Sequence, residues 1–341
     1  MRSNDQILDD FWKAGRSFLN TRYAIMGGAM SWVSEHNLVA AISNAGGFGV
    51  IAGGAMPPDL LKKEIEQTKA LTKNSFGVNL ITMHPQLDEL MDVCIETKVS
   101  HVILAGGIPP VQAVKKLKDV GIKVMCFAPA LVLAKRLVKS GVDALILEGT
   151  EAGGHIGPVA TNILVQEIVP YIKEVPVFVA GGIGTGEMMA AFLEMGAAGC
   201  QLGTRFVCTT ECVAHPNFKK AFIHANSRDA VPTVQIDPRF PVIPVRAITN
   251  EGTKRFMEFQ METIQKYQRG EMELKEAQLA IEHFWGGALR RAVIDGDVEN
   301  GSLMAGQSVG LVKEEKSVQA VIDELVSDAA DALRRLSRIT A

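Results

Sequence analysis

Residues 177–206 read VFVAGGIGTGEMMAAFLEMGAAGCQLGTRF, and this stretch contains the pattern that decides the fold. A short apolar run, Val177–Ala180, ends in two glycines, and helical apolar spacing follows over Gly186–Met195. A second apolar run, Gly199–Leu202, ends in another glycine. Continuous apolar runs are typical of strands that are buried on both faces of a parallel sheet. The stretch therefore predicts a strand, a helix and a second, parallel strand.

The same texture extends back to Tyr23 and predicts eight strands, with a helix after each of the first seven. The predicted strands are Tyr23–Met26, Gly49–Ala52, Phe76–Leu80, His101–Leu104, Lys123–Phe127, Ala144–Leu147, Val177–Ala180 and Gly199–Leu202. The predicted helices are Val33–Ala45, Asp59–Leu71, Leu87–Lys98, Val111–Val120, Ala130–Ser140, Asn162–Ile172 and Gly186–Met195. Eight such units in roughly 200 residues predict an α/β fold of the closed (β/α)8 (TIM) barrel type. A doubly wound open sheet is the alternative, but the residues after the first strand, GGAMSW, do not match its G-x-G-x-x-G motif.

The alternation of short apolar runs and helical spacing ends after Cys212. Residues 214–284 lack the strand–helix alternation, and Glu251–Gln268 and Glu271–His283 read as helices with a polar face. We therefore expect a mostly helical substrate or lid insertion at 214–284. The barrel is then formed by residues 1–213 and 285–341.

The last segment, Ser317–Ile339, carries an apolar stripe at helical spacing. Such a stripe predicts a helix that packs on the barrel or on a neighbouring subunit. A homodimer is therefore one expectation.

Composition excludes several classes of protein. The formal net charge is −3, with 47% hydrophobic and 21% charged residues, which is unlike a disordered chain or a nucleic-acid or anionic-membrane binder. The five cysteines are scattered in apolar contexts and predict buried, reduced thiols. The first residues do not resemble a signal peptide, and every apolar run is shorter than the ~20 residues of a membrane-spanning helix. We expect a cytoplasmic protein whose partner is a small-molecule or carrier-bound substrate.

Glycine-rich loops follow the last two predicted strands. Gly181, Gly182 and Gly184 come after the seventh, and Gly203-Thr204 comes after the eighth. Glycines let backbone N–H groups approach an anion closely, and barrels of this type often bind a phosphate at these two loops. The other interpretation is that the glycines only turn the chain tightly. Two such loops on consecutive strands favour a phosphate site.

A histidine stands among glycines after the sixth predicted strand, where residues 148–158 read EGTEAGGHIGP. Imidazole titrates near neutral pH, so His155 is suited to move a proton to or from carbon. The other interpretation is a solvated loop histidine. The chain contains no H-x-x-x-H and no G-x-S-x-G motif, so we expect neither a metal site nor a serine nucleophile.

Taken together, the motifs resemble one superfamily of FMN-dependent flavoproteins, which unites nitronate monooxygenases with type II enoyl-ACP reductases. The resemblance covers about residues 20–325 and rests on YAIMGGAMSWVSEHNLVAAISNAGGFGVIAGG, FGVNL, EGTEAGGHIG, VFVAGGIGTGE, QLGTRFV, AHPNFK and GSLMAGQ, in this order. It implies a (β/α)8 barrel with an inserted helical substrate domain, and it makes His155 the catalytic residue. It implies that FMN is bound by Met30, Asn79, Glu148, Gly153, Gly181, Gly182, Gln201, Leu202, Gly203 and Thr204.

Two features favour the enoyl reductase branch. Nitronate monooxygenases that resemble this chain usually carry Gln where Glu148 stands, and a longer segment follows their G-G-H than the roughly twenty residues between His155 and Pro176. The motifs VRAITN, GDVENGSLMAGQ and AHPNFK also look like this branch. The resemblance then implies NADH or NADPH as co-substrate and reduction of an enoyl thioester. One departure is Ala29. In the family the two residues before the methionine at position 30 are usually Gly-Gly, whereas this chain has Gly28-Ala29, which adds one methyl group.

Two alternatives remain. The same site would oxidise a nitronate or nitroalkane with FMN and O2, with His155 as the base. The protein would otherwise be a flavin-binding scaffold without catalysis.

Overall fold

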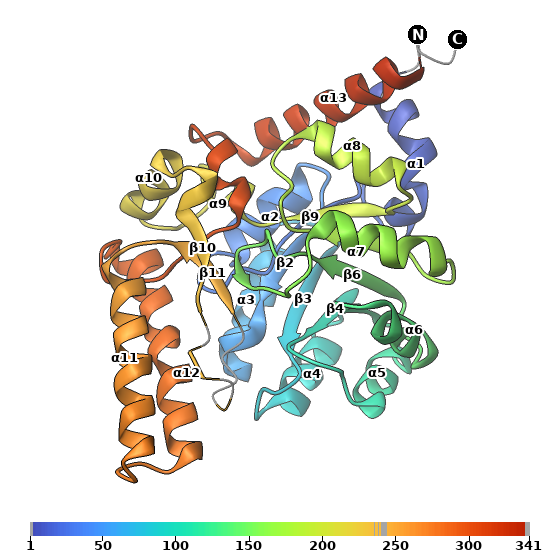
Figure 1. Cartoon of the computed structure of the whole chain (residues 1–341). Coiled ribbons are helices and arrows are strands. Elements are labelled where there is room, and N and C mark those ends of the chain that lie inside the picture. The colour runs from blue at the N-terminus through green and yellow to red at the C-terminus, as the bar shows by residue number, and fades with distance from the viewer. Residues whose placement is uncertain (1–2, 235, 238, 240–243, 338–341) are drawn as a thin grey trace.

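The computed structural model describes residues 3–234, 236–237, 239 and 244–337, and its centre is a parallel barrel (Figure 1). The strand order in the eight-stranded sheet is β1-β9-β8-β6-β5-β4-β3-β2. The two end strands also meet, because Met26 pairs with Phe48 and the Phe48 N–H donates to the Ile25 carbonyl at 2.8 Å. The (β/α)8 prediction is confirmed.

The barrel strands lie within two residues of their predicted positions. They are β1 (Ile25–Gly27), β2 (Gly49–Ala52), β3 (Phe76–Ile81), β4 (His101–Ala105), β5 (Lys123–Phe127), β6 (Ala144–Glu148), β8 (Val177–Ala180) and β9 (Gly199–Leu202). The helices between them are α2 (His36–Asn44), α3 (Pro58–Leu71), α4 (Leu87–Glu96), α5 (Val111–Lys118), α6 (Leu131–Lys139), α7 (Thr161–Ile168) and α8 (Gly186–Glu194). The largest shift is at α7, which ends at Ile168, four residues before the predicted Ile172, and α2 begins three residues after the predicted Val33. There the Glu35 carboxylate accepts from the N–H groups of Asn37 and Leu38 and so fixes the first turn.

A helix that was not predicted closes the amino end of the barrel. Helix α1 (Asn4–Leu19) buries Leu8, Trp12 and Leu19 along one face. Its last turn meets the starts of two strands, since the Phe18 carbonyl lies 2.9 Å from His101 Nε2 and accepts from Lys123 Nζ at 2.7 Å. We call this end of the barrel the floor.

The second half of the chain adds a small antiparallel sheet beside the carboxyl ends of the strands. It consists of β7 (Gly154–His155), β10 (Ala230–Pro232), β11 (Val245–Ile248) and β12 (Leu303–Met304), with β11 paired to the other three. The remaining helices are α9 (Thr204–Val207), α10 (Pro216–His224), α11 (Glu251–Gln268), α12 (Leu274–Arg290) and α13 (Val318–Ser337).

The predicted insertion contains two kinds of packing. Phe218 and Phe222 of α10 belong to the core of the barrel, whereas α11 and α12 share a separate core around Phe256, Ile264 and Ile281. Figure 1 shows α11 and α12 side by side as a hairpin that projects from the barrel. The domain boundaries at 214 and 284 stay predictions.

The apolar stripe of α13 is buried within the chain. Val318, Val321, Ile322 and Leu325 are each at most 1% exposed, and α13 packs on α8 and α1. The predicted helix is therefore present up to Ser337, and residues 338 and 339 lie outside the described part. A homodimer stays a prediction.

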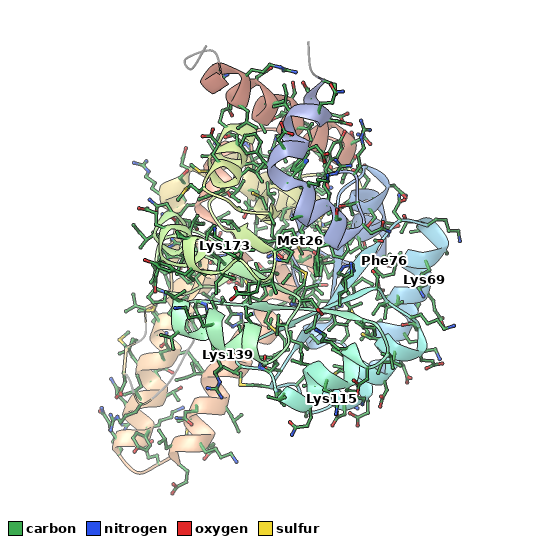
Figure 2. All side chains as sticks on the ribbon, turned by 90° about the vertical axis from the view of Figure 1, so that its right-hand side faces the viewer. Met26, Lys69, Phe76, Lys115, Lys139 and Lys173 are labelled. Atoms are coloured by element: carbon green, nitrogen blue, oxygen red, sulfur yellow. The ribbon has the colours of Figure 1, made fainter. Side chains whose placement is uncertain are left out.

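Side-chain burial follows the barrel architecture. Figure 2 shows Met26 and Phe76 in the interior, with Lys115 and Lys139 on the outer surface. All five cysteines are buried and unpaired, as predicted. Among the residues that the structure describes, no helix is both long enough and apolar enough to cross a membrane.

Candidate functional site

The carboxyl ends of the strands, which we call the mouth, bring together polar side chains from three strands. Glu148 of β6 pairs with Ala180 of β8, and Ala180 pairs with Gln201 of β9. Residues that are paired across parallel strands project from the same face, so Glu148 and Gln201 flank the small Ala180. Asn79 of β3 likewise pairs with a small residue, Ala52 of β2. These small neighbours leave room for a flat ligand.

These three polar side chains lack protein partners. Asn79 and Gln201 are 7% and 8% exposed. Within the part of the chain that the structure describes, neither they nor Glu148 forms a side-chain hydrogen bond. None of their polar atoms is among the fully buried atoms without a partner, so these side chains keep some contact with solvent at the opening. They are therefore available to hydrogen-bond a ligand there.

Glu148 is the most perturbed of the three. It keeps some access to solvent, yet protein atoms enclose its carboxyl group closely enough that desolvation raises its pKa to about 8. Glu148 therefore holds its proton at neutral pH and can donate a hydrogen bond. A strongly perturbed carboxyl group at an opening is a mark of functional sites.

The ends of β1 and β9 are in direct contact. The Gly28 N–H donates to the Leu202 carbonyl at 2.8 Å, and a Cβ atom on Gly203 would lie 3.4 Å from the Met30 sulfur. Thr204 Oγ1 accepts from the Gly306 N–H at 2.9 Å. The structure therefore brings Met30, Leu202, Gly203 and Thr204 together, as the sequence analysis expects.

Gly181 and Gly182 lie at a cavity of about 380 Å³. Both have positive φ (94° and 73°), a backbone conformation that residues other than glycine rarely adopt. The cavity is also lined by Glu151, Thr161, Ser227, Gln307 and Ser308, among others. Glu151 already accepts hydrogen bonds from the Thr161 N–H and hydroxyl at 2.9 and 2.8 Å. Of the residues expected at the phosphate, Gly181 and Gly182 line this cavity, whereas Gly203 and Thr204 are not among its lining residues. The carboxylate on its wall was not expected, and the phosphate site stays a prediction.

His155 is exposed at the tip of an arm, residues 150–159, that begins just after β6. The arm is closed at its base, where the Thr150 N–H donates to the Val159 carbonyl at 2.8 Å. Its tip forms strand β7, which pairs with β11 so that His155 lies opposite Val245. The histidine is thus held at the mouth by backbone pairing with the second half of the chain.

A family model described as nitronate monooxygenase matches residues 14–94 and 85–328, which together span most of the chain. The chain belongs to this family. Its members are flavin-dependent oxidoreductases, and the superfamily expected from the motifs is confirmed.

Relatives of known name lie in both branches of the family. FabK from Thermotoga maritima is 36% identical, with a TM-score of 0.86 over 95% of this chain and 98% of that one. A probable nitronate monooxygenase from Staphylococcus saprophyticus is 29% identical over 93% of this chain and 97% of its own length. A protein from Rhodococcus jostii, named (3aS,4S,5R,7aS)-5-hydroxy-7a-methyl-1-oxo-octahydro-1H-indene-4-carboxyl-CoA dehydrogenase, is 28% identical over 95% and 97%.

In this family member, two segments that the sequence analysis did not place at the site lie beside the arm that carries His155. Residues 303–307 pass behind the arm, where a Cβ atom on Gly153 would lie 2.5 Å from the Gly306 nitrogen. Arg246 of β11 pairs with Gly154, next to His155. The motifs GSLMAGQ and VRAITN are the sequence signal for both segments, but their spacing alone does not show that they meet the arm.

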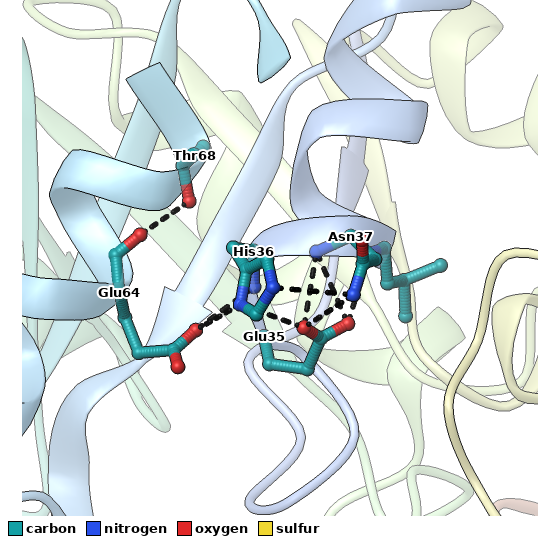
Figure 3. A network of polar contacts seen from close by, with 6 residues as sticks. Glu35, His36, Asn37, Glu64 and Thr68 are labelled. Carbon is teal, nitrogen blue, oxygen red and sulfur yellow. Dashed lines mark hydrogen bonds and ion pairs between the residues drawn. The ribbon is translucent and has the colours of Figure 1, made fainter. Parts of the chain in front are cut away.

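One histidine away from the mouth lies in a polar network at the outer edge of the barrel (Figure 3). His36 Nδ1 lies 2.8 Å from Glu64 Oε2 and 2.9 Å from Glu35 Oε2. These three residues could supply ligand atoms within 4.8 Å of one another. However, Glu35 caps α2, and Glu64 accepts from the His36 N–H at 3.0 Å, so the network already joins α2 to α3. We assign no metal site, and the expectation of none stays a prediction.

Proposed function

We propose that the protein is an FMN-dependent reductase that uses NADH or NADPH to reduce the C=C bond of an enoyl thioester. Glu148 is the observation that carries this proposal, because the nitronate monooxygenases that this chain resembles usually have Gln at that position. The similarity to FabK, an enoyl-ACP reductase II, over nearly the full length of both chains supports it.

The residues at the mouth fit FMN. The flavin ring is flat and has hydrogen-bonding groups along one edge. This suits the side chains of Asn79, Glu148 and Gln201, which lie at the mouth and form no side-chain hydrogen bond with the described residues. Met30 would lie against the ring, and Gly181, Gly182, Gly203 and Thr204 would hold the phosphate. When bound, FMN supplies hydride chemistry by accepting a hydride from NAD(P)H and passing it to carbon.

His155 would move the proton in this reaction. Reduction adds one hydride at Cβ of the enoyl thioester and one proton at Cα, while NAD(P)H becomes NAD(P)+. The exposed imidazole at the tip of the arm can deliver that proton to Cα directly or through one water. Pairing of β7 with β11 fixes the backbone of His155 opposite Val245.

A thioester substrate has support from a second relative. The name of the Rhodococcus protein identifies a carboxyl-CoA compound as its substrate. Dehydrogenation of a thioester removes the same hydride and proton that reduction adds. We therefore infer a thioester, carried by acyl carrier protein or coenzyme A, as the substrate class.

Oxidation of nitronates is the second candidate, and the names of the family model and of the Staphylococcus relative favour it. The acidic proton of a nitroalkane lies on the carbon that bears the nitro group. In this case His155 would remove that proton, and no nicotinamide would be needed.

One anaerobic experiment separates the two candidates. Purified protein loaded with FMN is mixed with NADH, NADPH or a nitronate, and the flavin absorbance is followed. The proposal predicts bleaching by one of the nicotinamides and recovery of colour on addition of crotonyl-CoA. Bleaching by the nitronate alone would show that the protein is a nitronate oxidising enzyme.

A further inference from the structure

Arg246 is a buried cation for which neither the fold nor the proposed chemistry has yet given a reason. It lies on β11 and is 5% exposed. Among the residues that the structure describes, no carboxylate lies within ion-pairing distance of its guanidinium group. Burial lowers its pKa, while the charge of Glu151, a residue of the arm, acts in the opposite direction. Burying an arginine in this way is costly, so the side chain must serve a purpose other than filling space.

The guanidinium group is bound by backbone carbonyls instead. Its Nε donates to the Thr150 carbonyl at 2.8 Å, and its Nη1 donates to the Ala230 carbonyl at 2.6 Å. Thr150 is the base of the arm that carries His155, and Ala230 belongs to β10. The side chain thus ties the base of the arm to the second sheet.

The backbone near the same residue holds the tip of the arm. Arg246 is paired with Gly154, and its neighbour Val245 is paired with His155. The Ile156 N–H donates to the Pro244 carbonyl at 3.0 Å. One short stretch of β11 therefore fixes both ends of the arm, through its backbone at the tip and through the Arg246 fork at the base.

We infer that Arg246 is the positioning residue for His155, and that its planar fork, rather than its charge alone, keeps the imidazole at the mouth. This inference rests on the proposed role of His155 in proton transfer. Arginine is suited to the task because one rigid group bonds two acceptors at once, which the single ammonium group of lysine cannot reproduce.

The test compares Arg246→Lys, His155→Gln and the double variant with the wild-type enzyme. We expect R246K to lower kcat by about 10- to 100-fold, as small displacements of a catalytic group do. In the H155Q background the same change should have less than about a twofold effect, because residues that act through one group are not additive. Effects that multiply in the double variant would overturn the inference, as would an unchanged kcat in R246K.

A second measurement needs neither substrate nor FMN. Hydrogen exchange of the Gly154–Ile156 amides in the apoprotein should be faster in R246K than in the wild type. Arg16→Lys is the control, because Arg16 lies in α1 at the floor and should change stability without changing exchange in the arm. Equal exchange in R246K and the wild type would contradict the inference.

The outcomes also separate this inference from the proposed function. If no enoyl thioester is reduced, the proposed function fails. The role of Arg246 is then decided by the hydrogen-exchange experiment and by comparing the wild type, R246K, H155Q and the double variant with a nitronate as substrate. A raised KM for the nucleotide or thioester with unchanged kcat would mean that Arg246 binds a ligand anion, which would overturn the positioning role.

Discussion

Polar side chains on the barrel strands differ between the floor and the mouth in whether the protein itself supplies their hydrogen-bond partners. The contrast concerns the strands alone, because Trp12 Nε1 and Arg16 Nε of α1, at the floor, are also buried without a partner among the described residues. At the floor, His101 is 1% exposed, and its two ring nitrogens lie 2.8 Å from Ser100 Oγ and 2.9 Å from the Phe18 carbonyl. At the mouth, Asn79 and Gln201 are nearly as buried, yet neither has a hydrogen-bond partner among the described residues. Both ends belong to the same eight strands, so the difference does not come from the fold.

This difference distinguishes polar groups that stabilise the fold from polar groups that are available to a ligand. A polar group that is satisfied by its own chain stabilises the folded state, whereas one that is left unpaired costs stability until a ligand binds it. The mouth is therefore the part of the molecule that is complete only with its ligand. Each prediction below sets a change at the mouth against a matched change at the floor or against the ligand-free protein.

Replacing the two histidines should give the largest contrast. His155→Gln at the mouth should lower turnover by about 10²- to 10⁴-fold with FMN still bound, because proton transfer loses its catalyst. His101→Leu at the floor should lower the free energy of unfolding by about 1–3 kcal/mol, because it leaves buried partners unpaired. Steady-state kinetics and urea denaturation measure the two effects. Equal losses of turnover in both variants would contradict the contrast.

Two glycines with similar backbone conformations give the next contrast. Gly182 (φ 73°) lies at the cavity of the mouth, and Gly121 (φ 82°) precedes β5 at the floor, with nothing within 4 Å of an added Cβ atom. Alanine at either position should cost stability of about 1–3 kcal/mol, because of the positive φ. Only Gly182→Ala should also weaken FMN binding, by about tenfold for each 1.4 kcal/mol of strain carried into the complex. Fluorescence titration with FMN measures this, and an equal loss in Gly121→Ala would contradict it.

Gln201→Leu should have opposite effects on the apoprotein and the complex. Without FMN it removes an unpaired buried amide, so the melting temperature should stay the same or rise. With FMN it should weaken binding by about fivefold, the value of one neutral hydrogen bond of about 1 kcal/mol. Thermal melting with and without FMN is the measurement. A lower melting temperature in the apoprotein would show that Gln201 stabilises the fold.

The last contrast is a pH dependence of opposite sign at the two ends. Burial raises the pKa of Glu148 to about 8, so its contribution to apoprotein stability is present below its ordinary pKa near 4.5 and is lost as pH rises through 8. Burial lowers the pKa of His101 to about 4, so its contribution is present above 6.5 and is lost as pH falls through 4.

Urea denaturation of the apoprotein between pH 4 and 9 tests this. Glu148→Gln should remove the fall in stability between about pH 4.5 and 8 and leave unchanged the opposite fall that His101 causes as pH drops from 6.5 to 4. If the fall toward pH 8 persists in that variant, Glu148 is not its source.

The strands of the barrel could be predicted from the sequence because they are buried on both faces and therefore read as short, mostly apolar runs. Val177–Ala180 and Gly199–Leu202 have these bounds in the structure as well. Helix α1 was missed, although its buried residues Leu8, Trp12 and Leu19 follow helical spacing among acidic and basic ones. Position along a strand was also enough to bring Glu148 and Gln201 together.

The arm and its support could not be predicted in the same way. Strand β7 is only two residues long, and its partner β11 follows about ninety residues later in the chain. No local pattern encodes such a pairing, since the two segments meet only after the barrel and the second sheet have formed. The contacts of Arg246 with Thr150 and Ala230 therefore could not be predicted from the sequence.

Titration of the apoprotein with FMN, followed by the quenching of flavin fluorescence, tests most directly that the unpaired groups of the mouth form a flavin site. We predict one FMN per chain, and in the double variant Asn79→Leu/Gln201→Leu an affinity lower by about 25-fold, the product of two hydrogen bonds of about 1 kcal/mol each. An apoprotein that does not bind FMN, or a double variant that binds it as tightly as the wild type, would contradict the account.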